Sequence, residues 1–371
     1  MKKLFFTIFL LFILISGQNS FAQLSGTVTL GSPGGAFANL TGAGGLFEAI
    51  NTLGLSGDLT VAVVGNTSED GTNALNSIAS GFGVYIIPSS ASTYTISGTG
   101  ITTNAMIRFN GCRKIYVEGS FLGAGQYLVF QNYNSTTAST TPVFEFTNEA
   151  RAIAVRNCYI RSNSSVTTNA SIRLGTTSGI LGNDSLYISK NIFEGINSER
   201  YFTAIFNNNA LAFPQSNSLI AITSNTFRKW RSTSTAIVDC GNLGDSIAVD
   251  SNYFYNDTAQ TVGFNIINYV STNSKYNSVS YNSIGGSAFD RSGSPLLNAN
   301  GTTLQAIRVS TSTAGLTTIR GNTISNIAGN DAVATCIING IVAIGRVDIY
   351  NNTLGGGANP WDTLHTTYDN G

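Results

Sequence analysis

Acidic, basic and aromatic residues in the C-terminal half of the chain have the chemistry needed to contact a ligand. They fall in one column of a repeated phrase, two residues before its polar residue. The column reads Val155, Ser189, Thr223, Asp250, Ser280, Arg320 and Tyr350. Asp348 stands two residues before Tyr350, so both point to one face of an alternating strand. We predict that Asp250, Arg320, Tyr350 and Asp348 form a shallow polar and aromatic binding patch, although ordinary solvated side chains also explain them.

Two further aromatic residues extend this candidate set. Phe193, Phe227 and Phe254 recur at one position of the phrase, which predicts a stacked core ladder. Trp230 and Tyr255 lie just beyond that ladder. Such rings have an apolar face and a polar edge, so we predict exposed contacts with sugars at Trp230 and Tyr255.

The sequence offers little of what a polysaccharide-cleaving site requires. A hydrolase needs two carboxylates flanking one glycosidic bond, but no Asp-Asp pair occurs and the sole histidine is His365. A lyase needs several carboxylates around calcium together with a basic residue, and the column holds one acid and one base, Asp250 and Arg320. Asp239 approaches Asp250 only if the register allows it. We predict no catalytic set, metal or cofactor, and expect calcium only if the chain is a lyase.

The repeated phrase sets the fold. Two β-prone apolar residues alternate, then come a small polar residue and another apolar residue, as in LYISKNIF at 186–193 and IAVDSNYF at 247–254. Alternation with Ile, Val, Thr and Phe indicates strands, and a second strand follows in copies such as TAIF at 203–206. A variable repeat of this size indicates a solenoid. We predict an all-β fold, a right-handed parallel β-helix with a short N-terminal capping helix.

The polar residue of the phrase has a structural role in such a coil. Stacked turns place equivalent residues about 4.8 Å apart, so each side-chain amide can bond the next one. Ser120 stands at this position in the first copy. The predicted ladder comprises Asn157, Asn191, Asn225, Asn252, Asn282, Asn322 and Asn352.

The N-terminus has the pattern of an export signal. Lys2 and Lys3 precede a mostly apolar run at 4–15, and Ser20-Phe21-Ala22 fits a cleavage site. We predict a signal peptide at 1–22, an N-terminal cap with the first strands at 23–97, and β-helix repeats at 98–371. No C-terminal cap is recognisable, so we expect the chain to be truncated there. Export places the protein outside the cell or on its outer surface.

Composition narrows the partners. The chain has 19 basic and 19 acidic residues, and no basic patch points to nucleic acid. No later apolar run reaches the roughly 18 residues of a transmembrane helix. The cysteines are too far apart for a zinc site, and we favour buried thiols over disulfides. They are Cys112, Cys158, Cys240 and Cys336.

A short Asp-Ser or Asp-Thr pattern, followed by a small or branched apolar residue, occurs four times. It is similar to an O-glycosylation sequon used on exported proteins of some Gram-negative bacteria. The same residues also suit the start of a strand after a turn, so both interpretations stay open. The candidate acceptors are Ser185, Ser246, Thr258 and Thr363.

The region before the repeats carries a family resemblance. AGGLFEAINTL at 43–53 has apolar residues at helical spacing, and DLTVAVV at 58–64 has the pattern of a strand. A helix of the form F-x-A-I-N, a G-D-x-x-V strand and Asn-rich turns resemble the pectin-lyase-like superfamily. That resemblance implies a β-helix but spans lyases, hydrolases, esterases and non-enzymatic adhesins. We expect a glycan-binding or adhesin-like scaffold, with a polysaccharide lyase or hydrolase as the alternative. A purely structural spacer is a third possibility, and the sequence does not indicate an oligomeric state.

Overall fold

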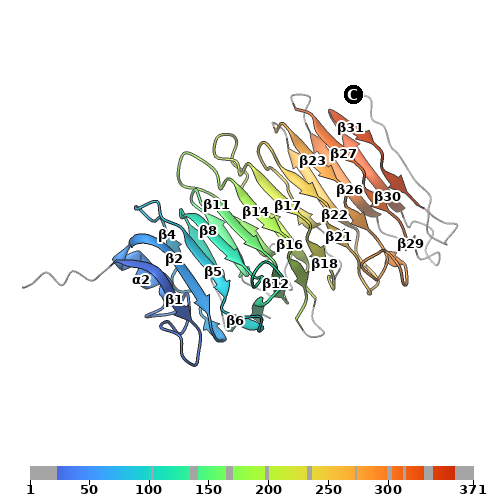
Figure 1. Cartoon of the computed structure of the whole chain (residues 1–371). Helices are drawn as coiled ribbons and strands as arrows, with labels where there is room; N and C mark the ends of the chain where they lie inside the picture. Colours follow the sequence, from blue (N-terminus) through green and yellow to red (C-terminus); the bar gives the residue numbers. More distant parts are fainter. Residues whose placement is uncertain are drawn as a thin grey trace, which may run out of the picture.

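The chain winds into a right-handed parallel β-helix whose strands stack along one axis in chain order (Figure 1). The computed structural model describes residues 23–99, 101, 104–133, 141–163, 170–196, 200–231, 236–271, 274–298, 303–311, 315–329 and 337–355. Three long sheets, which we call A, B and C, contain 11, 9 and 10 strands. A typical turn passes from sheet A to C to B and returns to A. The predicted fold class is therefore confirmed.

Most turns of the coil contribute one strand to each of the three sheets. Sheet A contains β1 (Leu24–Leu30), β2 (Leu55–Val63), β5 (Val84–Pro88), β8 (Arg113–Glu118), β11 (Arg151–Arg156), β14 (Leu186–Ser189), β17 (Ile220–Thr223), β20 (Ala248–Asp250), β23 (Asn277–Ser280), β27 (Thr317–Arg320) and β31 (Val347–Tyr350). Sheet B contains β4 (Leu75–Asn76), β7 (Ile107–Asn110), β10 (Phe144–Thr147), β13 (Ala170–Leu174), β16 (Thr203–Asn207), β19 (Ala236–Asp239), β22 (Phe264–Ser271), β26 (Thr303–Thr311) and β30 (Ile337–Ile344). Sheet C contains β3 (Thr67–Glu69), β6 (Tyr94–Thr99), β9 (Leu128–Tyr133), β12 (Cys158–Ser162), β15 (Ile192–Glu194), β18 (Thr226–Phe227), β21 (Tyr253–Phe254), β24 (Ser283–Ile284), β28 (Thr323–Ile324) and β32 (Thr353–Leu354). A separate pair consists of β25 (Leu296–Asn298) and β29 (Ile327–Gly329).

The repeated phrase forms two strands and the corner between them. In LYISKNIF, β14 ends at Ser189 and β15 begins at Ile192. Between them Lys190 has a φ of 56°, the left-handed conformation that turns the chain from sheet A to sheet C. Ser224 and Ser251 adopt the same φ sign at the equivalent corners. The apolar residue that ends the phrase therefore packs into the core from sheet C, whereas the two that begin it pack from sheet A.

The core fills the interior of the coil. Phe193, Phe227 and Phe254 are almost fully buried, and their rings stack with centroids 4.8 and 4.6 Å apart. This is the predicted phenylalanine ladder. Stacking of like residues on successive turns follows from the parallel register, which pairs these three residues directly. The outward residues of each strand are consequently free to differ between turns.

The asparagine ladder runs along the corner between sheets A and C. Asn191 donates from Nδ2 to Oδ1 of Asn225 at 3.2 Å, and Asn225 donates to Asn252 at 3.1 Å. Asn252 bonds Asn282 at 3.0 Å in the same way. Asn282 bonds Asn322, and Asn322 bonds Asn352. Each backbone N–H also donates to the next amide oxygen, as from Asn191 to Asn225 at 2.9 Å.

Asn157 is not part of this ladder, which corrects the sequence alignment. The strand register pairs Arg156 with Ser189, so Cys158 rather than Asn157 stands opposite Asn191. Accordingly the N–H of Cys158 donates to Oδ1 of Asn191 at 3.0 Å. Asn157 has a φ of 53° and occupies the corner position before the ladder.

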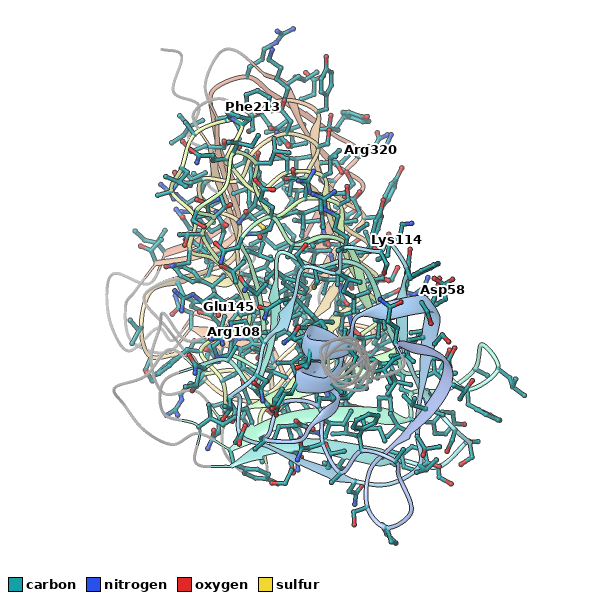
Figure 2. The ribbon with its side chains drawn as sticks, turned by 90° about the vertical axis from the view of Figure 1, so that its left-hand side faces the viewer. Asp58, Arg108, Lys114, Glu145, Phe213 and Arg320 are labelled. Atoms are coloured by element: carbon teal, nitrogen blue, oxygen red, sulfur yellow. The ribbon has the colours of Figure 1, made fainter. Side chains whose placement is uncertain are left out.

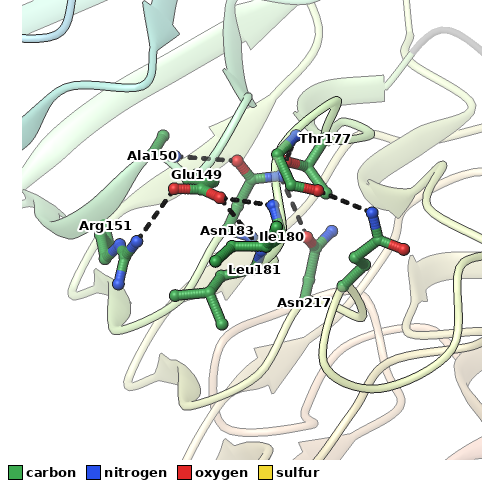
Figure 3. A network of polar contacts seen from close by, with 10 residues as sticks. Glu149, Ala150, Arg151, Thr177, Ile180, Leu181, Asn183 and Asn217 are labelled. Atoms are coloured by element: carbon green, nitrogen blue, oxygen red, sulfur yellow. Dashed lines mark hydrogen bonds and ion pairs between the residues drawn. The ribbon is translucent and has the colours of Figure 1, made fainter.

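A second corner, between sheets B and A, carries another polar network (Figure 3). Nδ2 of Asn183 donates to Oδ1 of Asn217 at 3.0 Å. Beside them the Glu149 carboxylate accepts the N–H of Leu181 at 3.0 Å and of Ile180 at 2.7 Å. These bonds, led by that from Leu181, lower the pKa of Glu149. The network holds the loop before β14 in a fixed position.

The N-terminal part contains the one helix of the described residues, α2 (Leu46–Leu53). It buries Leu46, Phe47 and Ile50, and its Phe47 ring lies 6.3 Å from that of Phe109. The loop before the helix is held by Glu69, which is 1% exposed. Its carboxylate accepts the N–H of Leu40 and of Thr41 and hydroxyls of Thr41 and Thr67. Helix and loop lie at the first end of the stack (Figure 1).

Cys112, Cys158 and Cys240 are buried free thiols. Burial raises the pKa of each of these thiols. Within the described ranges no helix has the length and apolarity to cross a membrane. The predicted signal peptide at 1–22, Cys336, Thr363 and His365 lie outside the described residues.

Candidate functional site

Asp250 ends β20 with its side chain on the outer face of sheet A, because Val249 before it lies in the core. The Ser278 hydroxyl donates to Oδ2 at 2.8 Å, and the N–H of Ser280 donates to Oδ1 at 2.8 Å. Burial raises the pKa of the Asp250 carboxyl, although these hydrogen bonds and the charge of Arg320 act in the opposite direction. Asp250 is a half-buried acid held by the neighbouring strand.

Arg320 lies two strands further along the same face. The register places it between Ser280 and Tyr350. Its guanidinium carbon is 5.2 Å from the centroid of the Tyr281 ring, and its Nη1 donates to Oη of Tyr350 at 3.5 Å. Tyr281 and Tyr350 are 54% and 43% exposed. The guanidinium is therefore flanked by two rings that face solvent, on the side of the stack seen at the right of Figure 2.

A groove of about 540 Å³ opens beside this cluster, at the start of β23 and β27. Its lining includes Lys275, Tyr276, Ser278, Thr318 and Arg346. The Tyr276 ring is 80% exposed. Ser278 both lines the groove and donates to Asp250, so this serine connects the groove to the Asp250 carboxylate.

The outer face of the last turns of sheet A therefore gathers the residues of the predicted patch. Asp348 is exposed on β31 and pairs in register with Thr318 of the groove. We call this surface the tyrosine face, comprising Asp250, Lys275, Tyr276, Tyr281, Arg320, Arg346, Asp348 and Tyr350. Tyr276, Tyr281 and the groove were not part of the sequence prediction.

Trp230 corrects the prediction of an exposed aromatic contact. It is 0% exposed and belongs to the hydrophobic core. Trp230 forms a parallel β-bridge with Tyr201. Its carbonyl oxygen accepts a hydrogen bond from Nδ2 of Asn256. Tyr255 is half-buried on the sheet C side, where Nη1 of Arg228 donates to its hydroxyl at 3.5 Å. Neither residue contributes to the tyrosine face.

Two of the candidate glycosylation acceptors lie at corners before strands. Ser185 and Ser246 are half-buried, with φ of 57° and 60°. The preceding Asp184 and Asp245 accept backbone N–H groups from the next turn at 2.8 and 2.7 Å. Thr258 is also half-buried. These contacts give the Asp residues a structural role at strand starts.

Sheet B carries a polar column that sequence reasoning missed. Nδ2 of Asn268 donates to Oδ1 of Asp239 at 2.9 Å, and Nη1 of Arg308 donates to Oδ1 of Asn268 at 3.0 Å. Burial raises the pKa of Asp239, against these contacts. Asp239 ends β19 on sheet B and Asp250 ends β20 on sheet A, so the two acids face different sides of the coil. They do not form an acid pair.

Within the described part of the chain, no group of three or more His, Cys, Asp or Glu side chains is placed to hold a metal ion. In comparisons with known proteins, no family model, curated protein or solved structure matches the chain. The arrangement of the outer faces is the basis for a functional proposal.

Proposed function

We propose that the protein is an exported β-helix scaffold that binds glycans outside the cell or at its surface without cleaving them. The observation that carries this proposal is the tyrosine face. Its three exposed phenol rings offer flat apolar surface for sugar rings. Arg320, Lys275 and Asp348 offer donors and acceptors for hydroxyl groups. Parallel strands fix several of these positions before a ligand arrives, which reduces the ordering cost of binding.

The architecture supports placing the chain among the pectin-lyase-like β-helix proteins, on the side of their adhesins and surface proteins. The supporting features are three parallel sheets, the stacked Asn corner and a helix beside the first turns. Fold alone does not select an activity. The export signal at 1–22 supports a location where extracellular polysaccharides are the available ligands.

The competing function is cleavage by a polysaccharide lyase or hydrolase with an atypical site. Both oxygens of Asp250 already accept hydrogen bonds from β23, and β23 also separates it from Arg320. A carboxylate positioned in this way is occupied by its own sheet. This arrangement favours binding over acid-base chemistry.

The test is retention on polysaccharides in native affinity gels, with and without calcium, together with an assay for new chain ends. Arg320→Ala removes the centre of the tyrosine face. Arg156→Ala is the matched control, because Arg156 lies in the same outward column of sheet A but pairs with Glu118. We expect retention of the wild type and of Arg156→Ala, loss of retention in Arg320→Ala, and no new chain ends.

Two outcomes contradict the proposal. Release of chain ends that disappears in Asp250→Ala makes the protein an enzyme. Retention on no polymer, or equal retention of both arginine variants, removes the tyrosine face as a glycan site.

A further inference from the structure

A second groove lies on another sheet, where sheet B meets the N-terminal helix. Its volume is about 490 Å³, within the range of small-ligand sites. Arg108 and Glu145 lie on the opposite side of the stack from Arg320 (Figure 2). Helix α2, the loop before β4, and strands β4, β7 and β10 all contribute to it. The lining comprises Asn51, Thr72, Asn73, Ala74, Asn76, Arg108, Asn110, Glu145, Thr147 and Asn148.

One wall of this groove is a ladder of exposed or half-buried amides. Nδ2 of Asn110 donates to Oδ1 of Asn76 at 2.7 Å, and Nδ2 of Asn148 donates to Oδ1 of Asn110 at 2.6 Å. The N–H of Ser178 then donates to Oδ1 of Asn148 at 3.1 Å. Each amide nitrogen has two N–H groups, and Asn110 and Asn148 each use one of theirs in the ladder. Stacking therefore fixes the amides while leaving donors available to a ligand.

The groove also contains one cation and one anion, each held at one end. Nη1 of Arg108 donates to Oδ1 of Asn104 at 2.9 Å. Oε1 of Glu145 lies 3.6 Å from Nε of Arg173. A guanidinium has five N–H donors and a carboxylate about four acceptor positions, so both side chains have capacity left. The lining charges, from Arg108 and Glu145, sum to zero.

We propose that this groove binds an uncharged saccharide unit by its hydroxyl groups. A hydroxyl donates and accepts at the same atom, which matches a wall of amides, hydroxyls, one guanidinium and one carboxylate. The balanced charge gives no net attraction for an anion, and the lining has no aromatic ring for a nucleobase. Apolar ligands are disfavoured because Ala74 is the one apolar side chain in the lining. The inference stands apart from the tyrosine face, because it uses different residues on a different sheet.

The test is to titrate the purified protein with neutral mono- and disaccharides and to measure their binding by calorimetry and by saturation-transfer NMR. Arg108→Ala removes the cation of the groove, and Glu145→Gln keeps the shape of the side chain while removing its charge. Arg308→Ala is the matched control, since Arg308 lies in the same outward column of sheet B outside the groove. Loss of a charge-assisted hydrogen bond predicts a Kd raised about tenfold or more in Arg108→Ala. Arg308→Ala should keep the wild-type Kd.

The outcomes separate this site from the tyrosine face. Sugar binding that survives in Arg320→Ala and falls in Arg108→Ala and Glu145→Gln supports the inference. Absence of sugar binding overturns it, as does equal weakening in Arg108→Ala and Arg308→Ala. Preferential binding of short uncharged peptides or of uronates also overturns it. Failure of polymer retention at the tyrosine face leaves these readouts unchanged.

Discussion

Asn225→Ala should remove one rung of the asparagine ladder at a large cost in stability. Asn225 is 0% exposed. Its Oδ1 accepts the backbone N–H and the amide of Asn191, and its Nδ2 donates to Ile188 and to Asn252. Alanine leaves two buried donors of Asn191 without their acceptor. At about 1–3 kcal/mol for each unsatisfied buried group, the free energy of unfolding should fall by about 4 kcal/mol.

The matched control is Asn157→Ala, one position before the ladder. Asn157 is half-buried, and its amide donates to Glu118 at 2.6 Å. Loss of this bond and alanine at positive φ together should cost about 1–2 kcal/mol. Urea unfolding followed by circular dichroism measures both variants, with an unchanged m-value required for the comparison. Equal costs, or a larger cost for Asn157→Ala, would refute a ladder register that excludes Asn157.

Three further predictions concern buried groups. Cys158→Asn should extend the ladder by one rung and change the unfolding free energy by less than about 1 kcal/mol. The control Ile160→Asn, on the same strand, should lower it by about 3 kcal/mol or more. Urea unfolding measures both variants. Burial raises the pKa of Asp239 above its ordinary value of 3.8, so the folded state keeps this proton to higher pH than the unfolded chain, and the associated stability is lost as the pH rises through the folded pKa. Asp239→Asn should flatten that fall in melting temperature above about pH 4; an unchanged slope contradicts the assignment. The thiols of Cys112, Cys158 and Cys240 should resist alkylation until the protein unfolds, because burial raises the pKa of each. Mass spectrometry measures the labelling, and rapid labelling of the native protein at any of the three would contradict this prediction.

Period-two alternation was sufficient to predict strands, and the recurrence of the phrase along the chain was sufficient to predict that they stack as a parallel β-helix. The corner inside each phrase was not predictable in this way. Lys190, Ser224, Ser251 and Tyr281 all take positive φ there, and these residue types share no turn signature. The backbone conformation is imposed by the stack rather than by the residue.

The misplaced Asn157 has a similar cause. Arg156-Asn157-Cys158 offers an Asn one residue before the position that the strand register selects. Sequence alignment follows residue identity, whereas the register follows backbone pairing and burial of the apolar residues. Cys158 fits the rung because its own N–H still reaches Asn191.

The candidate site was partly predictable for the same physical reason. Alternation places Asp250 and Arg320 on an outer face whatever the register of neighbouring turns. The exposure of Tyr276 and the burial of Trp230 depend instead on contacts between segments that are distant in the sequence. Trp230 is buried through its bridge to Tyr201, 29 residues earlier, and local pattern contains no sign of that contact.

Retention of a tyrosine double variant on polysaccharide gels tests the central claim most directly. Tyr281→Ala with Tyr350→Ala removes both rings beside Arg320, while Tyr187→Ala removes a ring that is 53% exposed elsewhere on sheet A. Glycan binding through the tyrosine face predicts that the double variant migrates freely on a polymer that retards the wild type and Tyr187→Ala. Equal retardation of all three proteins would contradict it.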